Sequence, residues 1–128
     1  AGVAYSGREV IHMAGATPQD VDVAAHHFIV SILELFKLLA LAFAEPGQAR
    51  VSALAGRTEL YGVLPINISG GLKSKGHPLG ASGVAQGFEV YEQLMGKAGD
   101  RQVNAELGLA CNVGGFGNCV TTTLLEVA

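Results

Sequence analysis

The sequence lacks an excess of positive charge. It has eight Lys and Arg residues against eleven Asp and Glu residues, which gives a formal net charge of −3 at pH 7. Proteins that bind the nucleic-acid backbone or an acidic membrane surface usually present a cationic field. We therefore expect no nucleic-acid partner, and any anionic ligand must be held by a local site.

Cysteines and long apolar runs are also scarce. Cys111 and Cys119 are too few for a disulfide framework, and no charged leader followed by an apolar run and a cleavage site opens the sequence. These features predict a reduced, cytoplasmic location. The most apolar stretch, 32–44, contains Glu34 and Lys37 and is shorter than the ~20 residues of a membrane span, so we predict no span.

Apolar residues and glycine are abundant. Apolar residues make up 49% of the chain, charged residues 15%, and 18 of the 128 residues are glycine. A disordered segment would be poorer in apolar residues and richer in charge. At ~100–200 residues per domain, the length predicts one domain over residues 1–128.

The order of the patterns along the chain predicts an α/β fold. We expect a helix over 6–13, a capped turn over 17–20, a buried strand over 21–25, an apolar helix over 32–44, a surface loop over about 48–63, a short extended piece over 65–67, a helix over 81–95, and two strands over 106–111 and 117–127 joined by a turn. A layered α/β unit normally covers both sheet faces and pairs its edges. These strands are few, so part of the fold is missing.

The strongest local signal is the glycine-rich run over 67–83. His77 stands between Gly76 and Pro78, just before the predicted helix over 81–95. Unpaired N–H groups and the helix dipole favour negative charge at a helix N-terminus. The setting predicts that His77 stabilises an oxyanion or a thiolate.

Three glycines fall at helical spacing beside this run. Gly80, Gly83 and Gly87 would form one stripe along the helix, where a partner backbone could approach closely. The alternative is that they only ease the change from loop to helix.

Cys111 ends a predicted strand and precedes a glycine-rich turn. A thiol there can act as an acid, a base or a nucleophile if a neighbour lowers its pKa, and we expect His77 to face it. Cys119, inside the last predicted strand, is expected in the core.

The other polar candidates predict less. His26 and His27 are adjacent, so in extended backbone they point to different sides and at most one faces a given site. No His or Cys pair has the spacing of zinc ligands, and we predict no metal site. Lys73, Lys75 and Arg57 are expected to be solvated.

The run over 67–83 resembles the thiolase motif N-x-x-G-G…G-H-P-x-G-x-[ST]-G at every fixed position. Residues 108–117 resemble the C-terminal active-site loop of thiolases, and segments 20–34, 45–47 and 56–60 resemble the lipid-transfer or sterol-carrier branch. The resemblance covers nearly the whole chain. It implies a thiolase-like C-terminal half, a layered α/β domain with a mixed sheet that is incomplete without an N-terminal half.

The resemblance also implies an activity. Thiolases transfer acyl groups between thioesters, in the Claisen condensation or cleavage of 3-oxoacyl-CoA, with coenzyme A thioesters as substrates and no tightly bound cofactor. Their nucleophilic cysteine lies in the N-terminal half, and they are oligomers. We expect this chain to need that half and to be inactive alone. The alternatives are a non-catalytic, thiolase-derived scaffold subunit, and a site in which Cys111 is the nucleophile.

Site residues follow from matching positions. His77 matches the histidine that activates the nucleophile, Cys111 the second cysteine that moves a proton at the α-carbon, and His27 a polar residue of an oxyanion site. The other positions expected to bind substrate or oxyanion are Gly114, Asn67 and Gly76.

Two departures from the branch are visible. The branch usually carries His-Asp-Cys-Phe or His-Asp-Ala-Phe where this chain has His-Phe-Ile-Val at 27–30, so His27 lacks an acidic neighbour. Many members have His at the position of Cys111.

Overall fold

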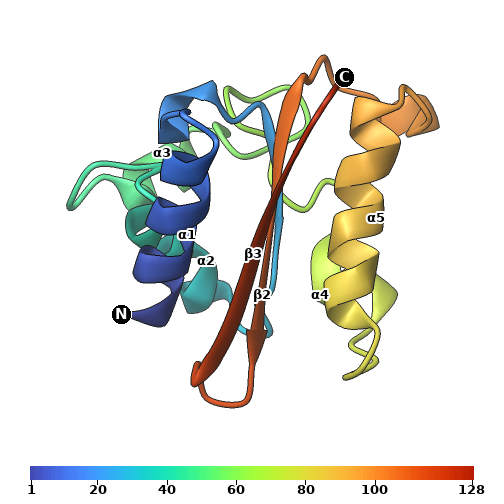
Figure 1. Cartoon of the computed structure of the whole chain (residues 1–128). Helices are drawn as coiled ribbons and strands as arrows, with labels where there is room; N and C mark the ends of the chain where they lie inside the picture. Colours follow the sequence, from blue (N-terminus) through green and yellow to red (C-terminus); the bar gives the residue numbers. More distant parts are fainter.

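The computed structural model describes all 128 residues, which form three layers with a sheet in the middle (Figure 1). In chain order the elements are α1 (Gly2–Met13), η1 (Pro18–Asp20), β1 (Val23–His26), α2 (Ser31–Ala40), α3 (Ala49–Leu54), α4 (Gly71–Lys75), α5 (Ser82–Leu94), η2 (Gly99–Arg101), β2 (Leu107–Gly114) and β3 (Cys119–Glu126). Helices α1, α2 and α3 lie on one side of the sheet, and α4 and α5 on the other.

The sheet has the order β1-β2-β3 and is mixed. β1 runs parallel to β2, with Val23 opposite Gly108 and His26 opposite Cys111. β2 and β3 form an antiparallel hairpin. The predicted extended piece at 65–67 adds only one bridge, from Ile66 to Ala24. The predicted α/β class with a mixed sheet is confirmed.

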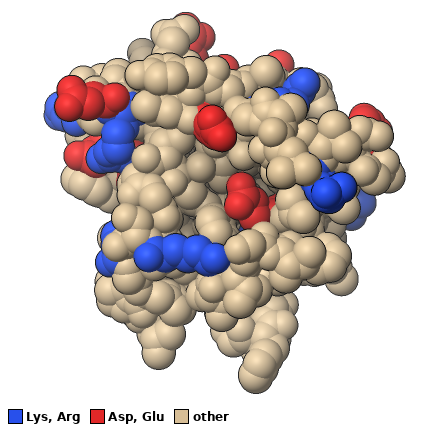
Figure 2. Space-filling view, turned by 180° about the vertical axis from the view of Figure 1, so that it is seen from behind, with Lys and Arg blue, Asp and Glu red and all other residues tan.

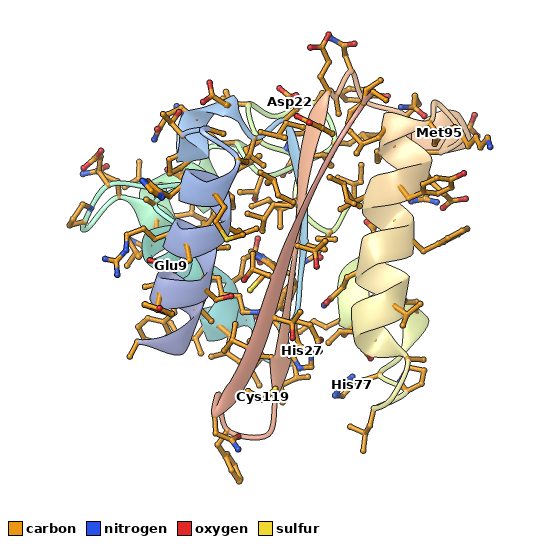
Figure 3. The ribbon with its side chains drawn as sticks, viewed as in Figure 1. Glu9, Asp22, His27, His77, Met95 and Cys119 are labelled. Atoms are coloured by element: carbon orange, nitrogen blue, oxygen red, sulfur yellow. The ribbon has the colours of Figure 1, made fainter.

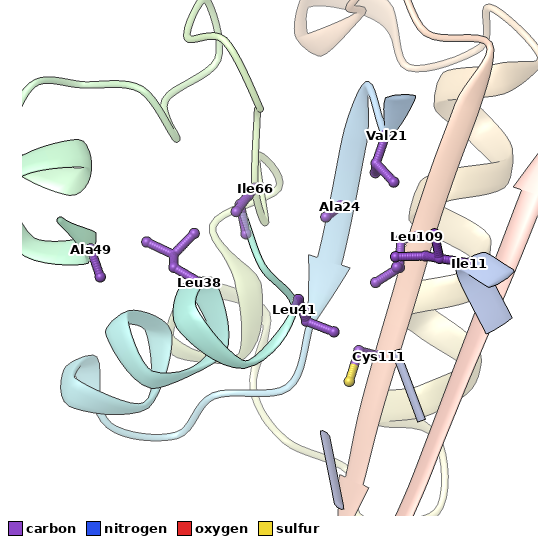
Figure 4. Close-up of a cluster of buried hydrophobic side chains, with 9 residues drawn as sticks. All are labelled: Ile11, Val21, Ala24, Leu38, Leu41, Ala49, Ile66, Leu109 and Cys111. Carbon is purple, nitrogen blue, oxygen red and sulfur yellow. The ribbon is translucent and has the colours of Figure 1, made fainter. Parts of the chain in front are cut away.

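Alternation along the strands divides the core between the two sheet faces. Ala24, Leu109 and Cys111 point to the α1 and α2 side, where they join the larger apolar cluster (Figure 4). Ala25 and Ala110 point the other way and pack with Val90 of α5. The same alternation sets the direction of the side chains at the end of the sheet where His26 pairs with Cys111.

Helix α2 is shorter than the apolar pattern predicts. It ends at Ala40, and Ala42 adopts a left-handed conformation with φ 58°. The N–H groups of Ala42 and Phe43 return to the carbonyls of Leu39 and Leu38, which is a Schellman ending. Glycine usually occupies this left-handed position and marks the end of a helix in the sequence. Here the residue is Ala42, so the apolar pattern predicted the end of α2 too late.

Two other predicted boundaries are corrected. The segment over 48–63 is not all loop, because α3 lies within it. Strand β2 does not end at Cys111 but continues to Gly114, since its pairing with β3 extends to the bridge between Gly114 and Cys119. The hairpin turn is therefore confined to residues 115–118.

None of the helices has the length and apolarity that crossing a membrane requires.

Candidate active site

Two imidazoles meet at one end of the molecule. His27 directly follows β1, and His77 lies in the loop between α4 and α5 (Figure 3). Their ring centroids are 4.7 Å apart and their planes are inclined by 85°. The β2–β3 hairpin reaches the same end of the molecule (Figure 1). The pair thus joins the end of β1 to the loop before α5, and its two residues are 50 positions apart in sequence.

The tautomer of His77 is set by Ser82, in the first turn of α5. The Ser82 hydroxyl lies 2.9 Å from the Pro78 carbonyl oxygen, to which it donates its only hydrogen. It must therefore accept from His77 Nδ1, 2.7 Å away. A neutral His77 then carries its hydrogen on Nδ1, and Nε2 is free to take a proton.

His27 is held through its own Nδ1, which lies 3.1 Å from Oδ1 of Asn112 in β2. Burial is the main cause that lowers the pKa of His27; the bond to Asn112 opposes this, while Lys37 and His77 lower the pKa further. His27 is therefore neutral at pH 7. Asn112 was not predicted as a site residue, although counting alternate positions from Ala110 would have placed it on the α5 side.

Lys37 of α2 is a second residue that sequence reasoning did not single out. Its ammonium group donates to the backbone carbonyl of His27, and the residue is only 5% exposed. Burial lowers the pKa of Lys37 to about 8. Lys37 therefore fixes the backbone that carries His27.

Asn67 serves the backbone rather than a substrate in this structure. Its Oδ1 accepts from the His26 N–H at 2.9 Å, and its Nδ2 donates to the His26 carbonyl at 3.1 Å. The left-handed φ of 51° at Asn67 allows this geometry. Both polar atoms of the Asn67 amide are thus bonded to the backbone at the end of β1, and a contact of Asn67 with substrate stays a prediction.

Two glycines predicted to bind substrate or oxyanion lie at the ends of α4 and β2. Gly76 ends α4 with φ 84°, and its N–H donates to the Leu72 carbonyl. Gly114 ends β2, where it pairs with Cys119. Substrate binding at both glycines stays a prediction.

The loop that carries His77 is tied to α5 by a buried carboxylate. Glu89 accepts hydrogen bonds from the backbone and hydroxyl of Ser69 at 3.0 and 2.5 Å, and it pairs with Lys75 at 2.9 Å. Lys75 is therefore not simply solvated as predicted. The network fixes the segment before Gly76 against the helix that follows it.

The structure does not bring Cys111 to His77. Cys111 is fully buried on the α1 and α2 face of the sheet (Figure 4), whereas Asn112 points toward Gly83 of α5. The Thr122 hydroxyl donates to its sulfur at 3.6 Å. Burial raises the pKa of the Cys111 thiol, although Lys37 and Thr122 oppose the rise. The expected pairing is therefore replaced by the pair of His27 and His77.

Cys119 was expected in the core and is exposed instead. It begins β3 beside the hairpin turn, where the strand has no helix over its outer side chains (Figure 3).

A large hollow lies beside His27. Its volume is about 820 Å³, and ten of its fifteen lining residues are apolar, with Lys37 and His27 among the polar ones. Pockets of this size and lining hold small-molecule groups.

The surface seen from behind the view of Figure 1 carries scattered acidic and basic side chains and no continuous basic patch (Figure 2). No three His, Cys, Asp or Glu side chains gather as a metal site.

Comparison with known families decides what this fold is. The model of the family described as "Thiolase C-terminal domain-like" matches residues 1–127. The chain belongs to this thiolase family. The thiolase domain is 44% identical over 113 residues to an acetyl-CoA acetyltransferase of Methanothermobacter thermautotrophicus, a match that covers 88% of this chain and 30% of that protein.

The same thiolase domain also resembles sterol carrier proteins. It is 42% identical over 123 residues to human sterol carrier protein 2, which covers 95% of this chain and 22% of that protein. The chain thus spans less than a third of these curated relatives. Among solved structures it is similar to "Ltp2-ChsH2(DUF35) aldolase", with a TM-score of 0.81 and 23% identity over 98% of this chain and 31% of that one. That likeness confirms the fold.

Proposed function

We propose that this chain supplies the C-terminal half of an acyl-CoA thiolase active site, which transfers acyl groups between coenzyme A thioesters. The observation that carries the proposal is the His27–His77 pair, in which each Nδ1 is bonded to a fixed partner. Family membership and the acetyl-CoA acetyltransferase relative support it. The chain would use no tightly bound cofactor.

In the proposed reaction His77 acts on a cysteine thiol of an N-terminal half. Nε2 of His77 takes the thiol proton, and the thiolate attacks the thioester carbonyl, so that a carbon–sulfur bond forms while the carbonyl electrons move onto oxygen. The protonated Nε2 donates a hydrogen bond to that oxyanion. When the carbonyl re-forms, the bond to the coenzyme A sulfur breaks, and Nε2 gives its proton to the departing thiolate, which leaves the acyl group on the cysteine. One such preorganised donor is typically worth ~2.7–4 kcal/mol in the transition state.

The geometry argues against a nucleophilic Cys111. A nucleophilic cysteine needs a low thiol pKa and access to the substrate, whereas this thiol is fully buried and its pKa is raised. The same burial weakens the role of α-carbon acid or base that the resemblance implies.

A substitution at His77 tests the proposal in the protein that carries both halves. His77→Ala should abolish the radiolabelled acyl-enzyme formed from acetyl-CoA, because no base then activates the thiol. Cys111→Ala should leave acylation intact and serves as the control. Normal acylation in the His77 variant would contradict the proposal.

The second candidate is a non-catalytic, thiolase-derived scaffold subunit. It is favoured by the absence of any cysteine thiol at the two imidazoles in this structure. A tightly associated partner that carries a reactive cysteine would decide for the enzyme, whereas a stable monomer that binds no coenzyme A would decide for the scaffold. Cytoplasmic location and oligomeric assembly are proposed with the enzyme, and fractionation and sedimentation test them.

A further inference from the structure

Asn112, His27 and Gly83 form one contact across three elements. Asn112 lies on β2, and its Oδ1 is 3.1 Å from Nδ1 of His27. A Cβ built on Gly83 of α5 would lie 3.1 Å from both Cγ and Nδ2 of the Asn112 amide. The amide therefore fills the space that a side chain at position 83 would take.

The orientation of the Asn112 amide decides which nitrogen of His27 carries the hydrogen. An amide oxygen only accepts, so Nδ1 must donate, and Nε2 of the neutral ring is left as an acceptor. With the amide turned over, Nδ2 would donate to Nδ1 and the hydrogen would move to Nε2. The two orientations give His27 opposite chemistry at its free nitrogen.

Burial lowers the pKa of His27 most, and two groups that face the ring act in the same direction. Lys37 approaches from α2 and His77 from the loop before α5, and both lower the pKa of His27. No carboxylate pairs with the ring. Asn112 can therefore orient His27 without a negative charge that would hold it as an imidazolium.

We propose that Asn112 is a positioning residue that holds His27 as the Nδ1–H tautomer, so that His27 presents Nε2 as a proton acceptor, and that Gly83 is required because it leaves room for the Asn112 amide. This assigns to His27, rather than to Cys111, the acceptance of a proton from the α-carbon. The α-carbon–hydrogen bond breaks, the proton moves to Nε2, and the electron pair is delocalised onto the thioester oxygen. Only this last assignment rests on the proposed function.

Nitrogen NMR of the protein labelled with 15N-histidine tests the tautomer directly. In the unsubstituted protein the correlations of His27 should show hydrogen on Nδ1. Asn112→Ala should give a mixture of tautomers, and Asn112→Asp should restore Nδ1–H and raise the pKa of His27. Asn118→Ala, an exposed asparagine of the same hairpin, should change nothing. Hydrogen on Nε2 in the unsubstituted protein, or no change in Asn112→Ala, overturns the proposal.

A double-mutant cycle tests the role of Gly83. Asn112→Ala and Gly83→Ala should each lower kcat by about tenfold, as expected for one lost hydrogen bond, with KM little changed. The pair together should lose no more than either alone, because both remove the same oriented amide. Losses that multiply in the double variant would show that Gly83 acts independently of Asn112.

The two arms separate this inference from the proposed function. If the protein has no thioester activity with its N-terminal half, the proposed function fails, while the NMR arm, including the tautomer of His27 in Gly83→Ala, still decides whether Asn112 and Gly83 set the ring. Circular dichroism of each variant excludes loss of folding as the cause of a changed spectrum.

Discussion

At the scale of single residues, the site depends on hydrogen bonds that leave one nitrogen of each imidazole free. Ser82 and Asn112 each accept at an Nδ1, so Nε2 of each neutral ring is left as a proton acceptor. Side chains held in this way need little rearrangement when charge develops, which is the general condition for electrostatic catalysis.

His26 makes the fold sensitive to acid. Its ring is buried, neither nitrogen has a partner, and burial with the nearby Lys37 lowers its pKa from 6.5 to about 3. Between pH 6.5 and about 3, His26 therefore binds a proton in the unfolded chain but not in the folded chain. The free energy of unfolding should fall as the pH drops from 6.5 toward 3, by up to ~1.4 kcal/mol per pH unit for one proton.

Replacing His26 should remove this dependence. His26→Leu is expected to flatten the fall of the unfolding free energy between pH 6.5 and 4.5, measured by urea titration at several pH values. Some slope should remain, because the lowered pKa of His27 acts in the same direction. His12→Gln, at an exposed position on α1, is the control. An unchanged slope in the His26 variant would show that the ring is protonated in the folded state.

At the scale of elements, the predicted glycine stripe on α5 does not form one surface. Gly80 precedes the helix, and Gly83 faces Asn112 inside the chain. Gly87 meets nothing within 4 Å of an added Cβ. Of the two stripe glycines within α5, Gly87 is therefore the one that remains open to a neighbour; Gly80, before the helix, is open as well.

Gly87→Ala should stabilise α5 in the chain alone by about 0.5–1 kcal/mol, because alanine loses less backbone entropy in a helix. Denaturant unfolding measures the gain. The same change should weaken association with an N-terminal half if a partner backbone approaches there.

The contrasting variant is Gly108→Ala. Its Cβ would overlap Val90, and the change should destabilise the fold by roughly 1–3 kcal/mol. Equal effects of the two changes would contradict this difference in packing.

At the scale of the whole molecule, α5 covers the sheet with one face and leaves the other apolar. Val84, Phe88 and Tyr91 on that outer face are 75%, 57% and 43% exposed, and contiguous apolar patches of this kind mark interaction sites. We propose that the N-terminal half covers this face, in keeping with a chain that spans less than a third of its curated relatives.

The isolated chain should therefore not cleave acetoacetyl-CoA with coenzyme A, whereas addition of an N-terminal half should restore cleavage. Val84→Glu with Phe88→Glu should prevent that restoration without unfolding the chain, since neither side chain is buried. Tyr5→Glu, exposed on the opposite layer, serves as the control. Cleavage by the chain alone would contradict the need for a partner half.

The sequence by itself determined the α/β class, the family resemblance and the place of His77, because glycine and proline at fixed spacing constrain the backbone locally. It did not establish the directions of Cys111 and Asn112, because the predicted strand stopped at Cys111. We expected the strand to end at Cys111, where the thiol would be free to turn toward His77. Pairing with β3 instead extends β2 to Gly114, and alternation then turns Cys111 into the core and Asn112 toward His27. Only the tertiary structure decides where such a strand ends, because its length depends on hydrogen bonds to a neighbouring strand and not on the residue pattern within the strand itself.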